Sequence, residues 1–279
     1  MVKRFLAVAF LVLLSFGSAA YGADLKIGIM QAQAGDAKKY QPLLDYLAQK
    51  GIPASFVTAS TYPAAADMFS KGQVDAMFSG SGIAGAMIIK GVADPLVRPV
   101  SQEGTSTYWA AVVVKKGGAK FTPTNDYFTG KRVIFTSLAS SGEFYFRSLG
   151  ESKAKELMLA ASHGAALDAL SRDQADVAIV KNRVWDKEKS KYADLEQVGK
   201  DSGENPDNTL IISKKLSKAT ADKLSTVLLG LGNDTSSEAK AVMASMKIEK
   251  FIKTTPADFK STLALLKKAG VNKSFNFKY

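Results

Sequence analysis

Short apolar segments alternate with segments of helical periodicity along the first third of the chain. Apolar positions recur every three or four residues in the longer segments, whereas the shorter segments are nearly continuous apolar runs. The expected strands are residues 25–30, 54–58 and 74–78, and the expected helices between them are residues 39–49 and 62–70. This alternation predicts an α/β fold with a mostly parallel sheet and helices on both faces.

The same rhythm recurs about one hundred residues later. Residues 65–78 read AADMFSKGQVDAMF and residues 166–179 read ALDALSRDQADVAI. Each segment contains a helical stretch, a polar break, a Gln-x-Asp and a buried strand. Two copies indicate two lobes of similar build, because a repeat array needs more copies. The alternative is a chance likeness between two ordinary αβ units.

Two further strong strands, residues 108–115 and 208–213, are candidates for the segments where the chain crosses between lobes. We therefore expect lobe one to comprise residues 24–112 and 210–279, and lobe two residues 113–209. Helical periodicity after the second crossing predicts three closing helices, near residues 217–231, 236–246 and 255–268.

The first residues have the order of a secretory signal peptide. A basic start, Met1–Arg4, precedes an unbroken apolar run over residues 5–14 and small residues over 18–23. The run is shorter than the roughly 20 residues that span a bilayer, which disfavours a membrane anchor. Cleavage near Gly22 would remove residues 1–22, and we expect the rest of the protein in a bacterial periplasm.

Composition narrows the class of function. The chain has no cysteine, so neither disulfides nor a lipid on an N-terminal cysteine is expected. Its formal charge of +11 would suit a nucleic-acid partner. However, export and the scattering of the lysines argue against nucleic acid, and a lysine-rich surface also attracts small anions. With His163 as its single histidine, and neither a P-loop nor a Gly-x-Ser-x-Gly motif, the sequence predicts no enzyme, metal site or cofactor.

Polar loops follow three of the predicted strands, at residues 79–82, 136–141 and 162–164. Ligands of open α/β sheets bind at the carboxyl ends of strands, and helix starts favour anions. The candidate ligands from these loops are Ser79, Ser81, Ser140, Ser141 and His163. Each has a structural alternative: residues 79–82 as a tight turn, Ser140–Glu143 as a capping box and His163 as a surface residue. Two tyrosines, Tyr62 and Tyr108, are either ligand contacts or packing aromatics.

At these residues the sequence resembles the phosphonate- and phosphite-type (PhnD-like) substrate-binding proteins of ABC transporters. The segments that carry the resemblance lie in order between Leu25 and Ile212: YQPLLDYLAQKGIPASFVTAS, GQVDAMFSG, PLVRPV, YWAAVVVKK, GKRVIFTSLASSG, SHGAALDAL and ADVAIVKNRVW. The resemblance implies the type II periplasmic-binding fold, with two α/β lobes and a ligand in the cleft between them.

The resemblance also assigns roles to particular positions. The family's Ser-Thr-Ser run, which holds an anionic head group, corresponds to Ala139-Ser140-Ser141, and the family histidine and aromatic correspond to His163 and Tyr62. The tyrosine of a Gly-Pro-x-Ser-Tyr loop is lost in residues 80–84. Where aminophosphonate binders carry an acid that meets the ligand amine, this sequence has Lys181 and no evident acid nearby, which favours a second negative charge on the ligand.

The sequence thus predicts a monomeric periplasmic binding protein that captures a small phosphonate- or phosphite-like anion and delivers it to an ABC permease in the inner membrane. Its predicted ligand-binding residues are Tyr62, Ser79, Ser81, Tyr108, Ser140, Ser141, His163 and Lys181. Two alternatives remain open: a ligand-sensing subunit for a membrane histidine kinase or chemoreceptor, and a hydrolytic enzyme using His163 and a carboxylate.

Overall fold

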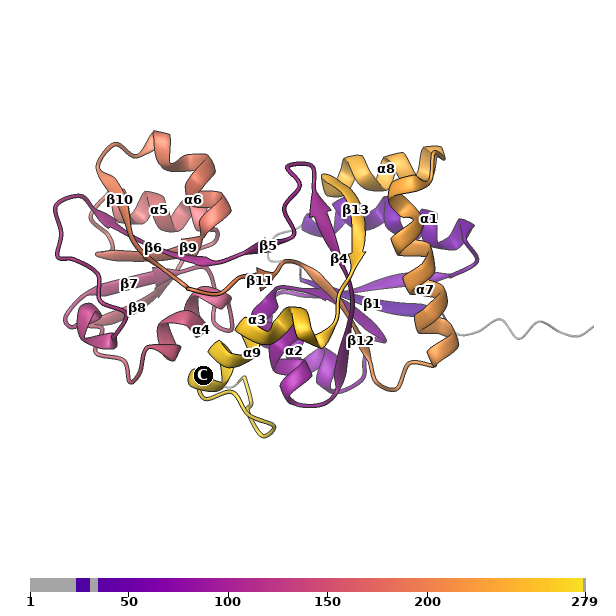
Figure 1. The fold of residues 1–279 in the computed structure, drawn as a ribbon, viewed down its shortest axis with the longest axis horizontal. Helices are drawn as coiled ribbons and strands as arrows, with labels where there is room; N and C mark the ends of the chain where they lie inside the picture. Colours follow the sequence, from indigo (N-terminus) through magenta and orange to yellow (C-terminus); the bar gives the residue numbers. More distant parts are fainter. Residues whose placement is uncertain (1–23, 31–34, 278–279) are drawn as a thin grey trace, which may run out of the picture.

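The computed structural model describes residues 24–30 and 35–277, so the predicted signal peptide lies outside the described residues. Two α/β lobes lie side by side and are joined by a narrow two-stranded ribbon (Figure 1). The ribbon pairs β5 (Thr107–Tyr108) with β11 (Asn205–Pro206) in antiparallel fashion. We define lobe one by the sheet that precedes and follows this ribbon, and lobe two by the sheet between its strands.

The sheet of lobe one has six strands in the order β13-β4-β12-β3-β1-β2. These strands are β1 (Leu25–Met30), β2 (Ala54–Ala59), β3 (Ala76–Ser79), β4 (Ala93–Ser101), β12 (Thr209–Ser213) and β13 (Ile248–Lys253). The helices of lobe one are η1 (Asp36–Tyr40), α1 (Gln41–Gln49), α2 (Tyr62–Ser70), α3 (Ser81–Ile89), α7 (Lys218–Gly230), η4 (Leu231–Asn233), α8 (Ser237–Met246), η5 (Pro256–Phe259) and α9 (Lys260–Lys268).

The sheet of lobe two has five strands in the order β10-β6-β9-β7-β8. These strands are β6 (Ala110–Lys115), β7 (Arg132–Phe135), β8 (Glu156–Leu159), β9 (Val177–Lys181) and β10 (Leu195–Lys200). The helices of lobe two are η2 (Asn125–Phe128), α4 (Ser141–Ser148), α5 (His163–Ser171), α6 (Asn182–Glu188) and η3 (Lys189–Lys191).

Both sheets are mixed, so the expectation of a mostly parallel sheet is wrong. Strand β1 pairs in parallel with β2 and β3, and β7 pairs in parallel with β8 and β9. The remaining pairs of both sheets are antiparallel. In each sheet the strand that follows a ribbon strand, β12 or β6, runs against both of its neighbours. Helices do cover both faces of each sheet, and every face has its own buried apolar cluster.

The two Gln-x-Asp segments have the same structural role, which favours two related lobes over a chance likeness. Asp75 Oδ2 accepts from the backbone amide of Lys26 in β1 at 2.9 Å, and the Asp75 amide donates back to the Lys26 carbonyl at 2.8 Å. In lobe two, Asp176 Oδ2 accepts from the Arg132 amide in β7 at 2.7 Å, and the Asp176 amide donates to the Arg132 carbonyl at 2.9 Å. Each aspartate thus fixes the start of its buried strand against the neighbouring parallel strand, β1 in lobe one and β7 in lobe two.

The two sheets divide the chain at the β5–β11 ribbon, a few residues before each predicted boundary. Strand β6, residues 110–115, lies wholly in the sheet of lobe two, whereas the sequence placed the boundary after residue 112. The lobes touch beyond the ribbon as well. Phe144 of α4 lies 6.2 Å, centroid to centroid, from Phe275 in the C-terminal segment after α9, and Arg147 lies over the same ring.

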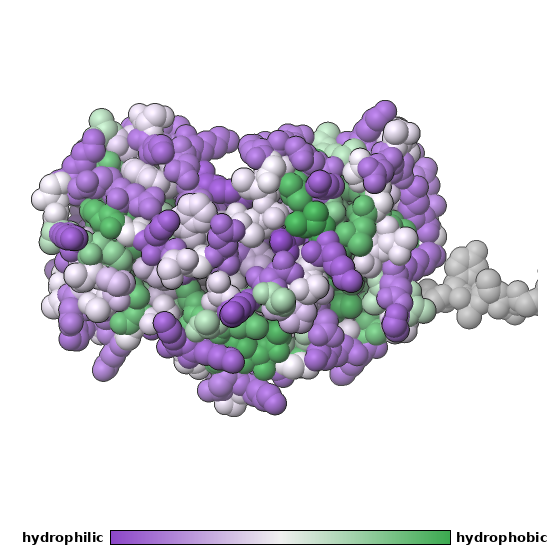
Figure 2. Space-filling view, in the orientation of Figure 1, coloured by the Kyte–Doolittle hydropathy of each residue, from purple (hydrophilic) through white to green (hydrophobic). Residues whose placement is uncertain are grey.

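Hydrophilic side chains cover most of the face in Figure 2, with smaller apolar areas between them. Among the helices that the structure describes, none combines the length and apolar character needed to cross a bilayer.

Candidate functional site

A small cavity of about 50 Å³ lies between the lobes, next to the ribbon. Its lining comes from lobe one, lobe two and the ribbon strand β5: Tyr62, Gly80, Gly82, Ile83, Tyr108, Thr136, Ala139, Ser140, Ser141, His163 and Lys181. All three polar loops that the sequence singled out contribute to this lining. One water needs roughly 10–15 Å³ of such volume, so the cavity holds about four water-sized groups.

The start of α4 is built by Ser140 and Glu143. The Ser140 Oγ caps the helix by accepting from the Glu143 amide at 3.2 Å, as the predicted capping box requires. The Glu143 carboxylate, however, accepts from the amide of Ala139, at 3.0 Å, and not from that of Ser140. Ala139 adopts a positive φ of 61°, which turns the loop into the helix. The amides of Ser141 and Gly142, the first two of the helix, have no acceptor within it.

A chain of hydroxyl groups connects the two lobes through Tyr108. The Tyr108 hydroxyl donates to Ser141 Oγ of lobe two at 2.7 Å and lies 2.6 Å from Ser81 Oγ of lobe one. Because Tyr108 donates to Ser141, Ser81 is the donor to Tyr108. The hydrogen of Ser141 is then left to donate to a group in the cavity. Burial raises the pKa of Tyr108, which keeps this phenol protonated.

Tyr62, the first residue of α2, contributes a second phenol to the lining. The Thr61 side chain before it caps the helix by accepting from the Ala64 amide at 3.2 Å. Burial raises the pKa of Tyr62, and the nearby Lys181 opposes this shift. Its hydroxyl is therefore also a neutral hydrogen-bond donor at physiological pH.

His163 lies at the first position of α5 and is neutral. Burial, with a smaller contribution from the charge of Lys181, lowers the pKa of His163 to about 3. Its Nδ1 accepts from the Lys181 backbone amide at 3.3 Å, so the proton of the neutral ring is on Nε2. A neutral ring also avoids the unfavourable interaction that a cation would have with the start of a helix.

Lys181 is the cation of the cavity, and the structure gives it an acidic partner. Its Nζ is 2.8 Å from Asp207 Oδ1, and Arg183 pairs with the other oxygen of Asp207. The expectation of no acid near Lys181 is therefore wrong, because Asp207 comes from the returning chain, 26 residues further along. Burial, and secondly the charge of Arg183, lower the pKa of Lys181 to about 8.

Six of the eight predicted site residues line the cavity: Tyr62, Tyr108, Ser140, Ser141, His163 and Lys181. Ser81 lies one hydrogen bond behind the lining, through Tyr108. Ser79 does not line the cavity. It is the last residue of β3, opposite Thr209 of β12, and both buried hydroxyls lack a hydrogen-bond partner in the described part of the chain.

The predicted set leaves out six residues of this region: Gly80, Gly82, Ile83, Thr136, Ala139 and Asp207. Thr136 is the first residue of the polar loop over residues 136–141, but it is not among the predicted ligands. Gly82 is needed for close approach of the lobes, since a Cβ there would lie 2.8 Å from the Ala139 carbonyl oxygen. The positive φ of Ala139 and the position of Asp207 leave no signal in a single sequence.

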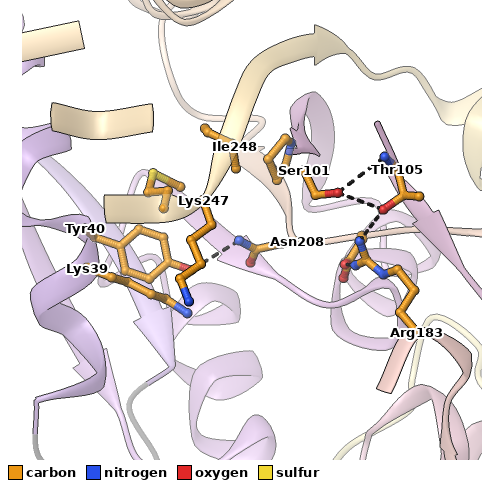
Figure 3. Close-up of a pocket in the computed structure, with 11 residues that line it drawn as sticks. Lys39, Tyr40, Ser101, Thr105, Arg183, Asn208, Lys247 and Ile248 are labelled. Carbon is orange, nitrogen blue, oxygen red and sulfur yellow. Dashed lines mark hydrogen bonds and ion pairs between the residues drawn. The ribbon is translucent and has the colours of Figure 1, made fainter. Parts of the chain in front are cut away.

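A second cavity of about 150 Å³, shown in Figure 3, has Asp207, Arg183 and Thr105 in its lining. Here Arg183 of α6 donates to Thr105 Oγ1 at 2.8 Å, and Thr105 Oγ1 lies 2.9 Å from Ser101 Oγ at the end of β4. Nearby, Asn208 donates to the Tyr40 hydroxyl at 3.2 Å. The Arg183 contact ties lobe two to the loop between β4 and β5 of lobe one.

Residues 27–259 match the family model of the phosphonate periplasmic substrate-binding proteins of ABC transporters. No curated protein matches the sequence. Among solved structures, the Xanthomonas citri protein XAC2383 bound to ATP has a TM-score of 0.73 at 16% identity, covering 88% of this chain and 96% of the other.

Two further solved structures resemble the fold. PhnD1 from Prochlorococcus marinus, in complex with methylphosphonate, has a TM-score of 0.65 at 18% identity over 88% of this chain and 98% of its own. A binding protein component of an ABC phosphonate transporter from Pseudomonas aeruginosa has a TM-score of 0.64 at 18% identity over 88% and 85%. These likenesses confirm the type II periplasmic-binding fold. By its family match, the chain belongs to the periplasmic phosphonate substrate-binding proteins of ABC transporters.

Proposed function

We propose that the protein captures a small phosphonate- or phosphite-like oxyanion in the cavity between its lobes and delivers it to its permease. The ligand contacts are the hydroxyls of Tyr62, Ser140 and Ser141 and the Nε2–H of His163, and Tyr108 orients the Ser141 hydroxyl by donating to it. Lys181 supplies positive charge at the edge of the site. Ser81 supports the site through Tyr108, and Ser79 has no place in this proposal because it lies outside the lining.

The observation that carries the proposal is the convergence of neutral donors on a cavity of about 50 Å³. The phenol of Tyr62, two serine hydroxyls, the first amides of α4 and one imidazole N–H are all hydrogen-bond donors. Hydrogen bonds to an ionised acceptor are roughly twice as strong as neutral ones, so an oxyanion gains from such a set. The volume suits a tetrahedral oxyanion with at most a small substituent.

Two of the similar solved structures contain different ligands, and the volume of the present cavity favours one of these ligands over the other. PhnD1 was solved with methylphosphonate and XAC2383 with ATP. A nucleotide has many times the volume of this cavity, whereas methylphosphonate consists of one phosphorus, one carbon and three oxygens besides its hydrogens. The geometry therefore favours a ligand of the size of methylphosphonate.

The two alternatives receive no support. The family is one of transport subunits, which favours delivery to a permease over signalling to a kinase or chemoreceptor. A hydrolase using His163 needs an imidazole that can take up a proton near neutral pH. The Nδ1 of His163 accepts from a backbone amide, and burial keeps its pKa near 3. We propose a monomer without catalytic activity, exported by cleavage near Gly22.

Calorimetric titration of the protein with phosphite, methylphosphonate, phosphate and sulfate at pH 7 tests this function. We expect one of the first two to bind most tightly. The double variant Ser140→Ala/Ser141→Ala removes two hydroxyl donors and should weaken that binding at least tenfold, which is about 1.4 kcal/mol.

The matched control is Ser236→Ala/Ser237→Ala, which removes the same two-serine start from α8 in lobe one. Ser236 caps α8 by accepting from the Ala239 amide at 3.2 Å, as Ser140 caps α4. The control should lose stability and keep ligand affinity. Absence of binding to all four anions would refute the proposed function, and equal affinity in the α4 variant would refute the assigned site.

A further inference from the structure

Lys181 separates the ligand cavity from a much larger groove. The groove, of about 1060 Å³, lies along α6 and the loop between β4 and β5. Among the described residues, Lys181 is the one that lines both spaces. Its side chain is 24% exposed, so one side remains accessible while the rest forms a wall.

Several contacts hold this wall in place. The Lys181 Nζ lies 2.8 Å from Asp207 Oδ1 and 4.3 Å from the centroid of the Tyr108 ring. Its backbone amide donates to His163 Nδ1, and the residue is fixed in the β6–β9 register opposite Ala110. An ion pair, a cation–π contact and a sheet register together restrict the side chain to one position.

The ammonium group of Lys181 also covers one face of the Tyr108 ring beside the cavity. A ligand substituent that extended from the oxyanion toward the groove would have to displace Lys181 from the Tyr108 ring and from Asp207. Displacement would break an ion pair that is largely withdrawn from water, which is costly. At pH 7 the lysine is mostly charged, because its pKa stays near 8 despite burial.

We infer that Lys181 is a specificity-determining residue that closes the groove side of the cavity and so limits the ligand to oxyanions with a very short substituent. This inference rests on the proposed function, whose ligand class it narrows. We therefore expect the affinity of the wild-type protein to depend more strongly on the length of the substituent that points towards Lys181 than on the head group.

The test compares methylphosphonate with n-propylphosphonate by calorimetric titration at pH 7. The wild type should bind the propyl compound at least tenfold more weakly than the methyl compound. Lys181→Ala joins the cavity to the groove and frees the Tyr108 ring for the alkyl chain, so the ratio of the two dissociation constants should fall at least tenfold, within the range that a few methylenes supply.

Three further variants make the test specific. Lys181→Met keeps an unbranched side chain of similar length but loses the ion pair and the cation–π contact, so its ratio should fall, by less than in Lys181→Ala. Lys187→Ala removes a lysine that lines the groove and not the cavity, and it should keep the wild-type ratio. Lys181 precedes the first residue of α6, where serine is a favoured cap, so Lys181→Ser replaces Lys181→Ala if the latter does not fold.

The outcomes separate this inference from the proposed function. A wild type that binds neither phosphonate and none of the other three anions of the functional test overturns the function and the inference together. A wild type that binds phosphite but neither phosphonate overturns the inference alone. Methylphosphonate binding with an equal affinity for the propyl compound, or with a ratio that Lys181→Ala leaves unchanged, overturns the inference alone.

Discussion

At the scale of single residues, His163 illustrates how burial sets protonation. Its pKa is about 3 in the folded protein, against an ordinary value of 6.5 for histidine. The imidazole of His163 therefore binds a proton below pH 6.5 in the unfolded chain but only below about pH 3 in the folded protein. The contribution of the neutral ring to the free energy of unfolding is fully present above pH 6.5 and is lost as the pH falls from 6.5 towards 3.

We expect the free energy of unfolding to fall by roughly 1–2 kcal/mol more in the wild type than in His163→Gln between pH 7 and pH 4.5, a value discounted for the partial exposure of the ring. Urea denaturation at the two pH values measures this difference. Glutamine does not titrate, so carboxylates that change in this range contribute equally to both proteins. Parallel losses in the two proteins would show that His163 is protonated in the folded state.

At the scale of elements, the start of α4 shows one hydroxyl serving both a helix and a site. Ser140 caps the helix and lines the cavity, whereas Ser236 caps α8 away from it. Ser140→Ala and Ser236→Ala should each lower the free energy of unfolding by about 1 kcal/mol, because each leaves one helix amide without its acceptor.

Affinity for the ligand should separate these two single variants. Ser140→Ala should weaken binding several-fold beyond its effect on stability, and Ser236→Ala should leave the dissociation constant unchanged. Denaturation and titration on the same samples provide both values. If Ser140→Ala lost stability but kept full affinity, its hydroxyl would be a cap and nothing more.

At the scale of the whole molecule, closure of the lobes depends on the absence of a side chain at residue 82. A Cβ on Gly82 would lie 2.8 Å from the carbonyl oxygen of Ala139 and 3.0 Å from the Phe144 ring, both in lobe two. The carbonyl oxygen of Ala139 belongs to the backbone, so moving it away from a Cβ would require a shift of the main chain. Gly82→Ala should therefore hold the lobes apart and weaken ligand binding at least tenfold, or about 1.4 kcal/mol.

Small-angle scattering checks the mechanism directly. The wild type should contract when ligand is added, and Gly82→Ala should contract less at saturating ligand. Gly230→Ala in α7 is the control, since a Cβ at Gly230 meets no atom within 4 Å and alanine suits a helix end. Full contraction and wild-type affinity in Gly82→Ala would exclude the steric argument.

The sequence by itself determined the local helices and strands and the polar loops that line the cavity. The strand over residues 25–30 and the helix over residues 62–70 have their predicted bounds, because apolar periodicity and caps are local signals. The hydroxyls at Ser140 and Ser141 were identified for the same reason. The family resemblance is likewise confirmed, and with it the two-lobed fold.

Only the tertiary structure decided which of the predicted polar residues lie together around the cavity. Ser79 was a reasonable candidate, yet all four residues of its strand are buried, so the sequence carries no alternation that would show which way its side chain points. Asp207 reaches Lys181 only because the returning chain follows the ribbon, and the same crossings make the sheets mixed. Contacts between distant segments depend on packing geometry, which local patterns do not encode.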